Sequence, residues 1–314
     1  MKTLFILWGM AVLYLLSQGQ RGFFAVSADE PKRDSYVVLY CAQDEFLAEP
    51  LLKEFTHRTG CEVRTVYDSE AVKTVGLANR LLAERGHPGA DVFWGNEEFR
   101  TRWLASNGVF VASNGWSAFG KRSRRLVINT NRLSATTAPK SLAALTNAVW
   151  RGKVSIAYPS FGTTSTHLMV LRAEWGPERW TEWCRALASN APFLEEGNSE
   201  VVARVGRGQA WIGLTDSDDI AAGCKEGLPI LALPQEPWSL DMPNTVAIVR
   251  GARHPRMAEE LRQFLISPPV QQQLIEAGGL EALQTHPDVL RPNWERVLSD
   301  FTVASDQLEK LFRR

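Results

Sequence analysis

The stretch Tyr36–Tyr40 reads YVVLY, and this continuous apolar run decides the expected fold. A strand buried on both faces has apolar residues at successive positions, which is typical of a parallel sheet covered by helices. A helical pattern follows it and stops at Thr59-Gly60. Further strands are expected at residues 62–67 and 90–94, separated by a helix at 69–84 that Ser69 caps. This β-α-β-α-β order predicts an α/β fold with a doubly wound sheet.

A second series of alternating elements follows the first. It comprises expected strands at residues 126–130, 153–158, 210–214 and 245–249, and expected helices at residues 164–175, 180–188, 218–225, 257–265 and 270–277. The chain is long enough for two lobes. We expect the first part of lobe 1 at residues 34–125 and lobe 2 at 126–242. The return segment of lobe 1 and C-terminal helices are expected at 243–314.

The N-terminus has the pattern of an export signal. Lys2 precedes an apolar stretch at residues 4–16, and Val26-Ser27-Ala28 offers a small-residue cleavage site. We therefore expect a signal peptide at residues 1–28 and a periplasmic or extracytoplasmic protein. Because Arg21 and Phe23-Phe24 depart from the usual pattern, an uncleaved anchor remains the alternative.

Composition excludes some partners and some chemistry. The chain has 314 residues, with 35 Lys plus Arg and 35 Asp plus Glu, so no net charge draws it to nucleic acid. Four cysteines match no zinc pattern. Cys184 and Cys224 are the better candidates for a disulfide, because Cys41 and Cys61 are expected at opposite ends of neighbouring parallel strands.

A hydroxyl-rich segment, Ser160–His167, follows an expected strand and opens an expected helix. Unpaired backbone N–H groups and the helix dipole favour an anion at such a position. Thr163, Thr164 and Ser165 are the predicted anion donors. Simple capping of the helix by one hydroxyl is the alternative.

An acidic segment, Gly213–Asp219, follows another expected strand. Its crowded carboxylates need a cation, a basic group of a ligand or a neighbouring arginine. Capping and favourable contact with the helix dipole are the alternative. We predict a metal set of Asp216, Asp218, Asp219 and Glu97. The predicted ligand-binding set, drawn largely from strand ends, is Gln43, Asp44, Asn96, Glu97, Thr163, Thr164, Ser165, Asn198, Thr215, Asp216 and Asp219.

The sequence lacks the motifs of a nucleophile elbow, a zinc protease, a P-loop or a dinucleotide site. We therefore expect binding and not turnover. An exported enzyme with Asp216 as its base, or a sensor that reports the ligand to a membrane partner, are the alternatives.

Four segments carry a family resemblance: Tyr40–Asp44, Gly89–Trp94, Trp150–Val154 and Pro243–Ala247. The chain resembles extracellular solute-binding proteins of the ferric iron-binding branch from about Tyr36 to Leu280. The resemblance implies a type II periplasmic-binding-protein fold, with two doubly wound α/β lobes joined by a hinge.

The resemblance also implies a function. A monomer would capture a small solute between its lobes and deliver it to the permease of an ABC importer. Fe³⁺ or another hard cation with a companion anion would be the transported ligand, and no resident cofactor is expected. Relatives offer adjacent tyrosines where this chain has Asp218-Asp219. A small organic anion such as a phosphonate, with Asp216 or Asp219 meeting an amine, is therefore the alternative ligand.

Overall fold

A computed structural model describes residues 35–67, 73–112, 115–281 and 287–313. The expected signal segment at residues 1–28 and the expected cap Ser69 lie outside these ranges. Within them, every helix falls short of the length and apolar character needed to cross a membrane.

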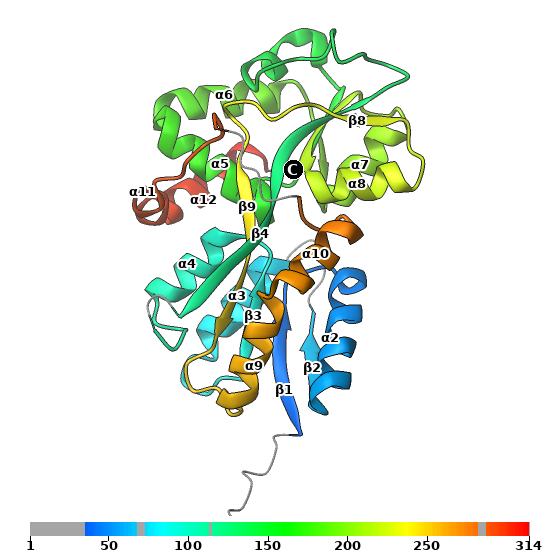
Figure 1. Cartoon of the computed structure of the whole chain (residues 1–314). Helices are drawn as coiled ribbons and strands as arrows, with labels where there is room; N and C mark the ends of the chain where they lie inside the picture. Colours follow the sequence, from blue (N-terminus) through cyan, green and yellow to red (C-terminus); the bar gives the residue numbers. More distant parts are fainter. Residues whose placement is uncertain (1–34, 68–72, 113–114, 282–286, 314) are drawn as a thin grey trace, which may run out of the picture. The chain divides into compact units, whose positions relative to one another are not determined.

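The first lobe contains the expected alternation of strands and helices (Figure 1). Its elements are β1 (Tyr36–Cys41), α2 (Glu45–Thr59), β2 (Glu62–Val66), α3 (Lys73–Ala83), β3 (Val92–Gly95) and α4 (Glu98–Ser106). Strand β1 pairs in parallel with both β2 and β3. The predicted strands and helices of this half are thus confirmed, with small shifts at their ends.

The second lobe repeats this arrangement. Its elements are β5 (Val154–Ala157), α5 (Gly162–Trp175), α6 (Pro177–Ser189), β6 (Phe193–Glu195), α7 (Asn198–Gly206), β7 (Ile212–Asp216), α8 (Ser217–Lys225) and β8 (Ile230–Ala232), with short 3₁₀ turns at Ala143–Thr146 and Ala148–Trp150. The strand order is β2-β1-β3-β9-β4-β7-β5-β6. Each lobe therefore has its first strand between its second and third, as in a doubly wound sheet.

Two long strands, β4 (Trp116–Asn129) and β9 (Asp241–Ile248), connect the lobes (Figure 1). They pair with each other, while β9 also pairs with β3 and β4 also pairs with β7. The expected strand at residues 126–130 is only the end of the 14-residue β4. The charged residues Lys121, Arg122 and Arg124 are buried in its middle, which is why the apolar pattern did not reveal that part.

The remaining helices divide between two sets of core residues. Helices α9 (Pro255–Leu265) and α10 (Pro268–Ala277) pack with α2 around the first sheet. The C-terminal α11 (Trp294–Ser299) and α12 (Phe301–Leu311) contact α5, and their apolar residues join the core of the second lobe. The segment 243–314 therefore contributes to both lobes, with its last two helices on the second.

The structure does not support the suggested disulfide. Cys184 is buried in α6 and Cys224 is exposed on α8, and neither forms a disulfide. Burial raises the pKa of the Cys184 thiol well above its ordinary value, so this group is not a reactive nucleophile.

Gly120 lies at the irregularity where the register between β4 and β9 shifts. Its φ is +53°, and a Cβ there would lie 2.3 Å from the Leu280 side chain. We expect Gly120→Ala to lower the free energy of unfolding by about 1–3 kcal/mol, because it adds backbone strain and a clash. Urea denaturation would measure this, with Gly86→Ala, which has open space around its Cβ position, as control. Equal stability of the two variants would contradict the expectation.

Candidate functional site

A cavity of about 1020 Å³ lies between the two lobes. From the first lobe it is lined by the residues after β1 and the first turns of α2, and by Tyr67 after β2. From the second lobe it is lined by Ser199 on α7 and by α8, and the end of α10 completes it. The cavity thus lies beyond the carboxyl ends of β1 and β7, where ligands bind in α/β sheets.

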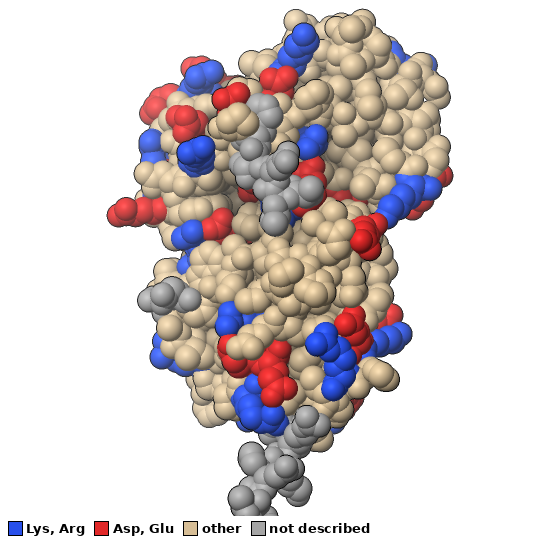
Figure 2. Space-filling model, in the orientation of Figure 1, with Lys and Arg blue, Asp and Glu red and all other residues tan. Residues whose placement is uncertain are grey.

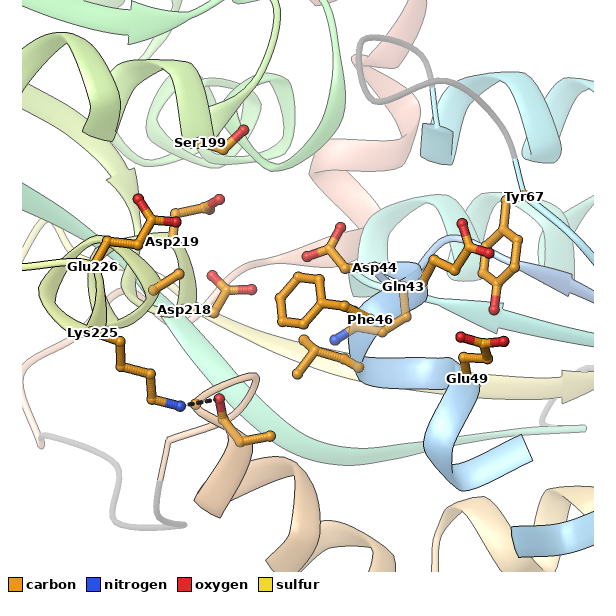
Figure 3. Close-up of a pocket in the computed structure, with 15 residues that line it drawn as sticks. Gln43, Asp44, Phe46, Glu49, Tyr67, Ser199, Asp218, Asp219, Lys225 and Glu226 are labelled. Atoms are coloured by element: carbon orange, nitrogen blue, oxygen red, sulfur yellow. Dashed lines mark hydrogen bonds between the residues drawn. The ribbon is translucent and has the colours of Figure 1, made fainter. Parts of the chain in front are cut away.

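The described lining of this cavity is strongly acidic. Six of its side chains are acids, namely Asp44, Glu45, Glu49, Asp218, Asp219 and Glu226, and one is a lysine, Lys225. Lys225 donates a hydrogen bond to the carbonyl oxygen of Ala277, which also lines the cavity (Figure 3). Figure 2 shows both acidic and basic atoms at the waist between the lobes and on the rest of this face. The charge of the lining favours a positively charged ligand.

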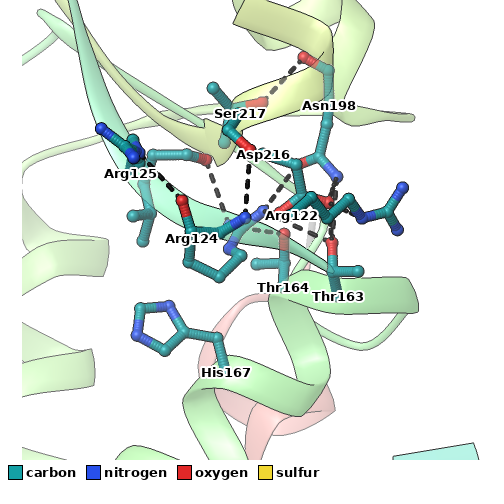
Figure 4. Close-up of polar contacts among 12 residues, drawn as sticks. Arg122, Arg124, Arg125, Thr163, Thr164, His167, Asn198, Asp216 and Ser217 are labelled. Atoms are coloured by element: carbon teal, nitrogen blue, oxygen red, sulfur yellow. Dashed lines mark hydrogen bonds and ion pairs between the residues drawn. The ribbon is translucent and has the colours of Figure 1, made fainter. Parts of the chain in front are cut away.

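Asp216 lies deeper, in a buried network with arginine side chains of β4 (Figure 4). Arg124 Nη1 donates to Asp216 Oδ1 at 2.8 Å, and Arg122 Nε lies 3.6 Å from Asp216 Oδ2. Burial alone would raise the pKa of Asp216, but Arg124 and Arg122 hold it below its ordinary value. Asp216 is therefore an ionised partner of these two arginines.

Neighbouring predicted residues complete this network. Asn198 accepts from Arg124 at 2.9 Å through Oδ1 and donates to Asp216 at 3.1 Å through Nδ2. Thr163 donates to Asp216 at 2.6 Å, and Thr164 accepts from Arg124 at 3.1 Å. The Thr215 hydroxyl donates to the carbonyl oxygen of Asn198 at 3.1 Å. These side chains hold one another in place behind the cavity.

The hydroxyl-rich start of α5 is buried rather than open to the cavity. Thr163, Thr164 and Ser165 are each at most 3% exposed. The Ser165 hydroxyl has no hydrogen-bond partner among the described residues. Helix α5 begins without a side-chain cap, since its N-cap residue is Phe161. The prediction that these hydroxyls hold an anion stays a prediction.

Glu97 caps α4. Its Oε1 accepts from the backbone N–H of Arg100 at 2.9 Å, and its Oε2 accepts from the Thr166 hydroxyl at 3.3 Å. Complete burial raises the pKa of Glu97 to about 7, although Arg100 opposes the shift. The carbonyl oxygen of neighbouring Asn96 accepts from Arg122 at 3.0 Å. These contacts link the end of β3 to α5 and β4.

The three aspartates of the acidic segment lie together, with possible ligand atoms within 4.8 Å of one another. Asp218 accepts a hydrogen bond from Arg122 Nη1 at 2.7 Å, so arginines donate hydrogen bonds to both Asp216 and Asp218. The pKa of Asp218 is raised to about 6, mainly by burial and also by repulsion from Asp216 and Asp44, although Arg122 lowers it. Burial and Asp218 raise the pKa of Asp219 well above its ordinary value. An added positive charge would relieve this repulsion.

Several residues that line the cavity were not predicted from the sequence. They include Phe46, Glu49, Tyr67, Ser199 and Lys225. Phe46 has the helical spacing of the apolar residues of α2, yet it is 67% exposed, so its spacing gave no sign that it lines the cavity. Tyr67 directly follows β2. Its place at the end of a strand was the available signal for it.

Both lobes with their connecting strands and the cavity between them define a two-lobed binding protein. A family model described as "Bacterial extracellular solute-binding protein" matches residues 37–279. The chain belongs to this family. The expected type II periplasmic-binding-protein fold is thereby confirmed.

Solved structures agree with this fold. Iron-bound HitA from Pseudomonas aeruginosa is 19% identical with a TM-score of 0.75, and the alignment covers 88% of this chain and 99% of HitA. The ferric binding protein from Campylobacter jejuni is 16% identical with a TM-score of 0.76, covering 88% and 99%. AfuA from Actinobacillus pleuropneumoniae, bound to fructose-6-phosphate, is 19% identical with a TM-score of 0.72, covering 88% and 96%. At these low sequence identities, the likeness shows a shared fold and not a shared ligand.

Proposed function

We propose that this protein captures a positively charged solute in the cavity between its lobes and delivers it to the permease of an ABC importer. The acidic lining of the cavity carries the proposal, because six carboxylates and one lysine surround a space of small-molecule size. In this account the N-terminal segment exports the chain, and the lobes close around the solute by bending at β4 and β9. No bond is made or broken.

Two kinds of cation fit this proposal at the level of charge. Fe³⁺ or another hard cation is supported by the iron-bound relatives and by the cluster of Asp216, Asp218 and Asp219. An organic cation is supported by the arginines that already bond two of these carboxylates. The cavity takes a positive charge in either case.

A phosphorylated or phosphonate solute is the second candidate function. The observation that favours it is that α5 begins without a side-chain cap. No capping side chain then competes with an anion for the first backbone N–H groups of the helix. AfuA, with its sugar phosphate, has the same fold. Against this candidate, Arg122 and Arg124 are ion-paired with aspartates and would have to leave them to neutralise a phosphate.

A thermal-shift screen of the exported form of the chain separates these candidates. The three groups of probes are ferric citrate with divalent metals, small amines with quaternary ammonium compounds, and sugar phosphates with phosphonates. We expect stabilisation by a positively charged probe, because a ligand that binds only the native state raises the melting temperature. Stabilisation by phosphate-bearing probes alone would overturn the proposal.

The binding of a cation should depend on pH. A cation stabilises ionised Asp218 and Asp219, so it lowers their pKa values and releases protons. Since the pKa of Asp218 is raised to about 6 without ligand, affinity should be highest above pH 6 and fall as the pH drops below it. The expected loss is up to about tenfold per pH unit for each proton displaced. Titration calorimetry between pH 5 and pH 8 would measure it, and affinity that rises toward pH 5 would contradict it.

A further inference from the structure

Phe46 is an aromatic side chain exposed inside the acidic cavity. It lies in the first turn of α2, lines the cavity and is 67% exposed. Figure 3 shows its ring near Asp44, projecting from α2 toward α8, the helix that carries Asp218 and Asp219. Aromatic faces attract cations, and the attraction grows when the cation loses its water. The ring therefore offers a surface for an organic cation.

Gln43 gives an independent indication that a ligand occupies this place. It lines the same cavity and is 1% exposed, yet neither its amide nitrogen nor its amide oxygen has a hydrogen-bond partner among the described residues. Leaving a buried polar group unpaired destabilises the folded protein, so such a group usually has a partner. The Gln43 amide can both donate to and accept from a polar substituent of a ligand.

The carboxylates are arranged for a diffuse positive charge rather than a bare metal ion. A hard metal ion needs several oxygen ligands that converge on it. Of the three clustered aspartates, Asp216 is bonded by Arg124, Asn198 and Thr163, and Asp218 is bonded by Arg122. Asp219 remains directed toward the cavity, and Asp44 lies across from it (Figure 3). Two carboxylates on opposite walls suit an ammonium group between them.

We propose that the solute is a small organic ammonium compound. Its positive group lies between Asp44 and Asp219, its carbon atoms contact the face of Phe46, and a polar substituent bonds to the Gln43 amide. This inference rests on the proposed function and specifies the substrate class of the same cavity. It makes Phe46 and Gln43 the residues that select an organic cation over a metal ion.

Calorimetric titration of the exported chain tests the substrate class. The probes are choline, putrescine and agmatine, with 3,3-dimethylbutan-1-ol as the neutral isostere of choline, and ferric citrate as the metal probe. We expect at least one ammonium probe to bind, and the neutral isostere not to bind. Binding of ferric citrate without any ammonium probe would overturn this inference and leave the proposed function standing. Binding of none of the positively charged probes or the metal would overturn both.

Variants of Phe46 test the aromatic contact. Phe46→Ala and Phe46→Leu should weaken binding of the ammonium probe by about 5- to 30-fold, whereas Phe46→Trp should keep or improve it. Because Phe46 is largely exposed, these variants should unfold at the same urea concentration as the wild type. Equal binding by the Leu and Trp variants would contradict the aromatic contact.

In the same titrations Gln43→Leu should lower affinity for choline more than for putrescine, without loss of stability.

Discussion

Asp216→Ala is expected to lower the free energy of unfolding by about 3–5 kcal/mol, because it leaves the buried Arg124 without its counter-charge and leaves Arg122 with Asp218 as its remaining ion-pair partner. Arg124 is 0% exposed and Asp216 is 1% exposed, so both charges are shielded from bulk water. Thr163 and Asn198 would also lose an acceptor. Urea denaturation followed by circular dichroism would measure the change.

Two controls sharpen this test. Glu62→Ala removes one partner of the exposed Arg64–Glu62 pair and should change stability by less than about 1 kcal/mol. If Asp216→Ala does not fold, the double variant Asp216→Ala with Arg124→Met should recover part of the loss, because it removes a buried unpaired charge. An Asp216→Ala variant as stable as the wild type would contradict the role given to this network.

Asp219→Asn is expected to have the largest effect on ligand binding. Of the three clustered aspartates, Asp219 is the one to which neither Arg122 nor Arg124 donates a hydrogen bond in the described part of the chain, and removing its charge should weaken binding of a cation by about 10- to 100-fold. The change should also stabilise the ligand-free protein, because the raised pKa of Asp219 means that ionisation opposes folding. That gain should be present above the ordinary aspartate pKa and vanish below about pH 4, where the unfolded chain is protonated too.

Calorimetric titration of Asp219→Asn would check the weaker binding, and urea denaturation of the same variant would check the gain in stability. Glu226→Gln, a change of the same kind at another lining residue, serves as the control and should affect binding less, because Glu226 lies at the end of α8. Asp219→Glu should recover part of the affinity. Weaker binding together with a loss of stability would contradict the account, since it would indicate a structural role for Asp219.

Much of the fold was predictable because buried strands such as β1 and β3 are short and apolar. The strand at Tyr36–Cys41 and the helix that follows illustrate this, and the ends of β1 and β7 led directly to the cavity. Residues 116–125 of β4 were not predictable from the pattern. Its arginines look like a solvated segment in the sequence, and only their aspartate partners, about ninety residues later, explain their burial.

The candidate site was predictable in part. Gln43, Asp44, Asp218 and Asp219 line the cavity, as strand-end reasoning suggested. Thr163, Thr164 and Asn198 instead bond to Arg124 or Asp216 behind it. One of the possibilities considered for the crowded carboxylates, a neighbouring arginine, is present. The spacing of residues in the sequence could not reveal which carboxylates form ion pairs with an arginine, because those pairs depend on the pairing of β4 with β7.

The most direct test of the central claim is a crystal structure of the chain with its solute bound. The account predicts a positive group of the solute within about 4 Å of the carboxylates of Asp219 and Asp44. Arg124 would still donate a hydrogen bond to Asp216, as it does in the structure. A phosphate on the first turn of α5, with Arg124 turned away from Asp216 to meet it, would contradict the account.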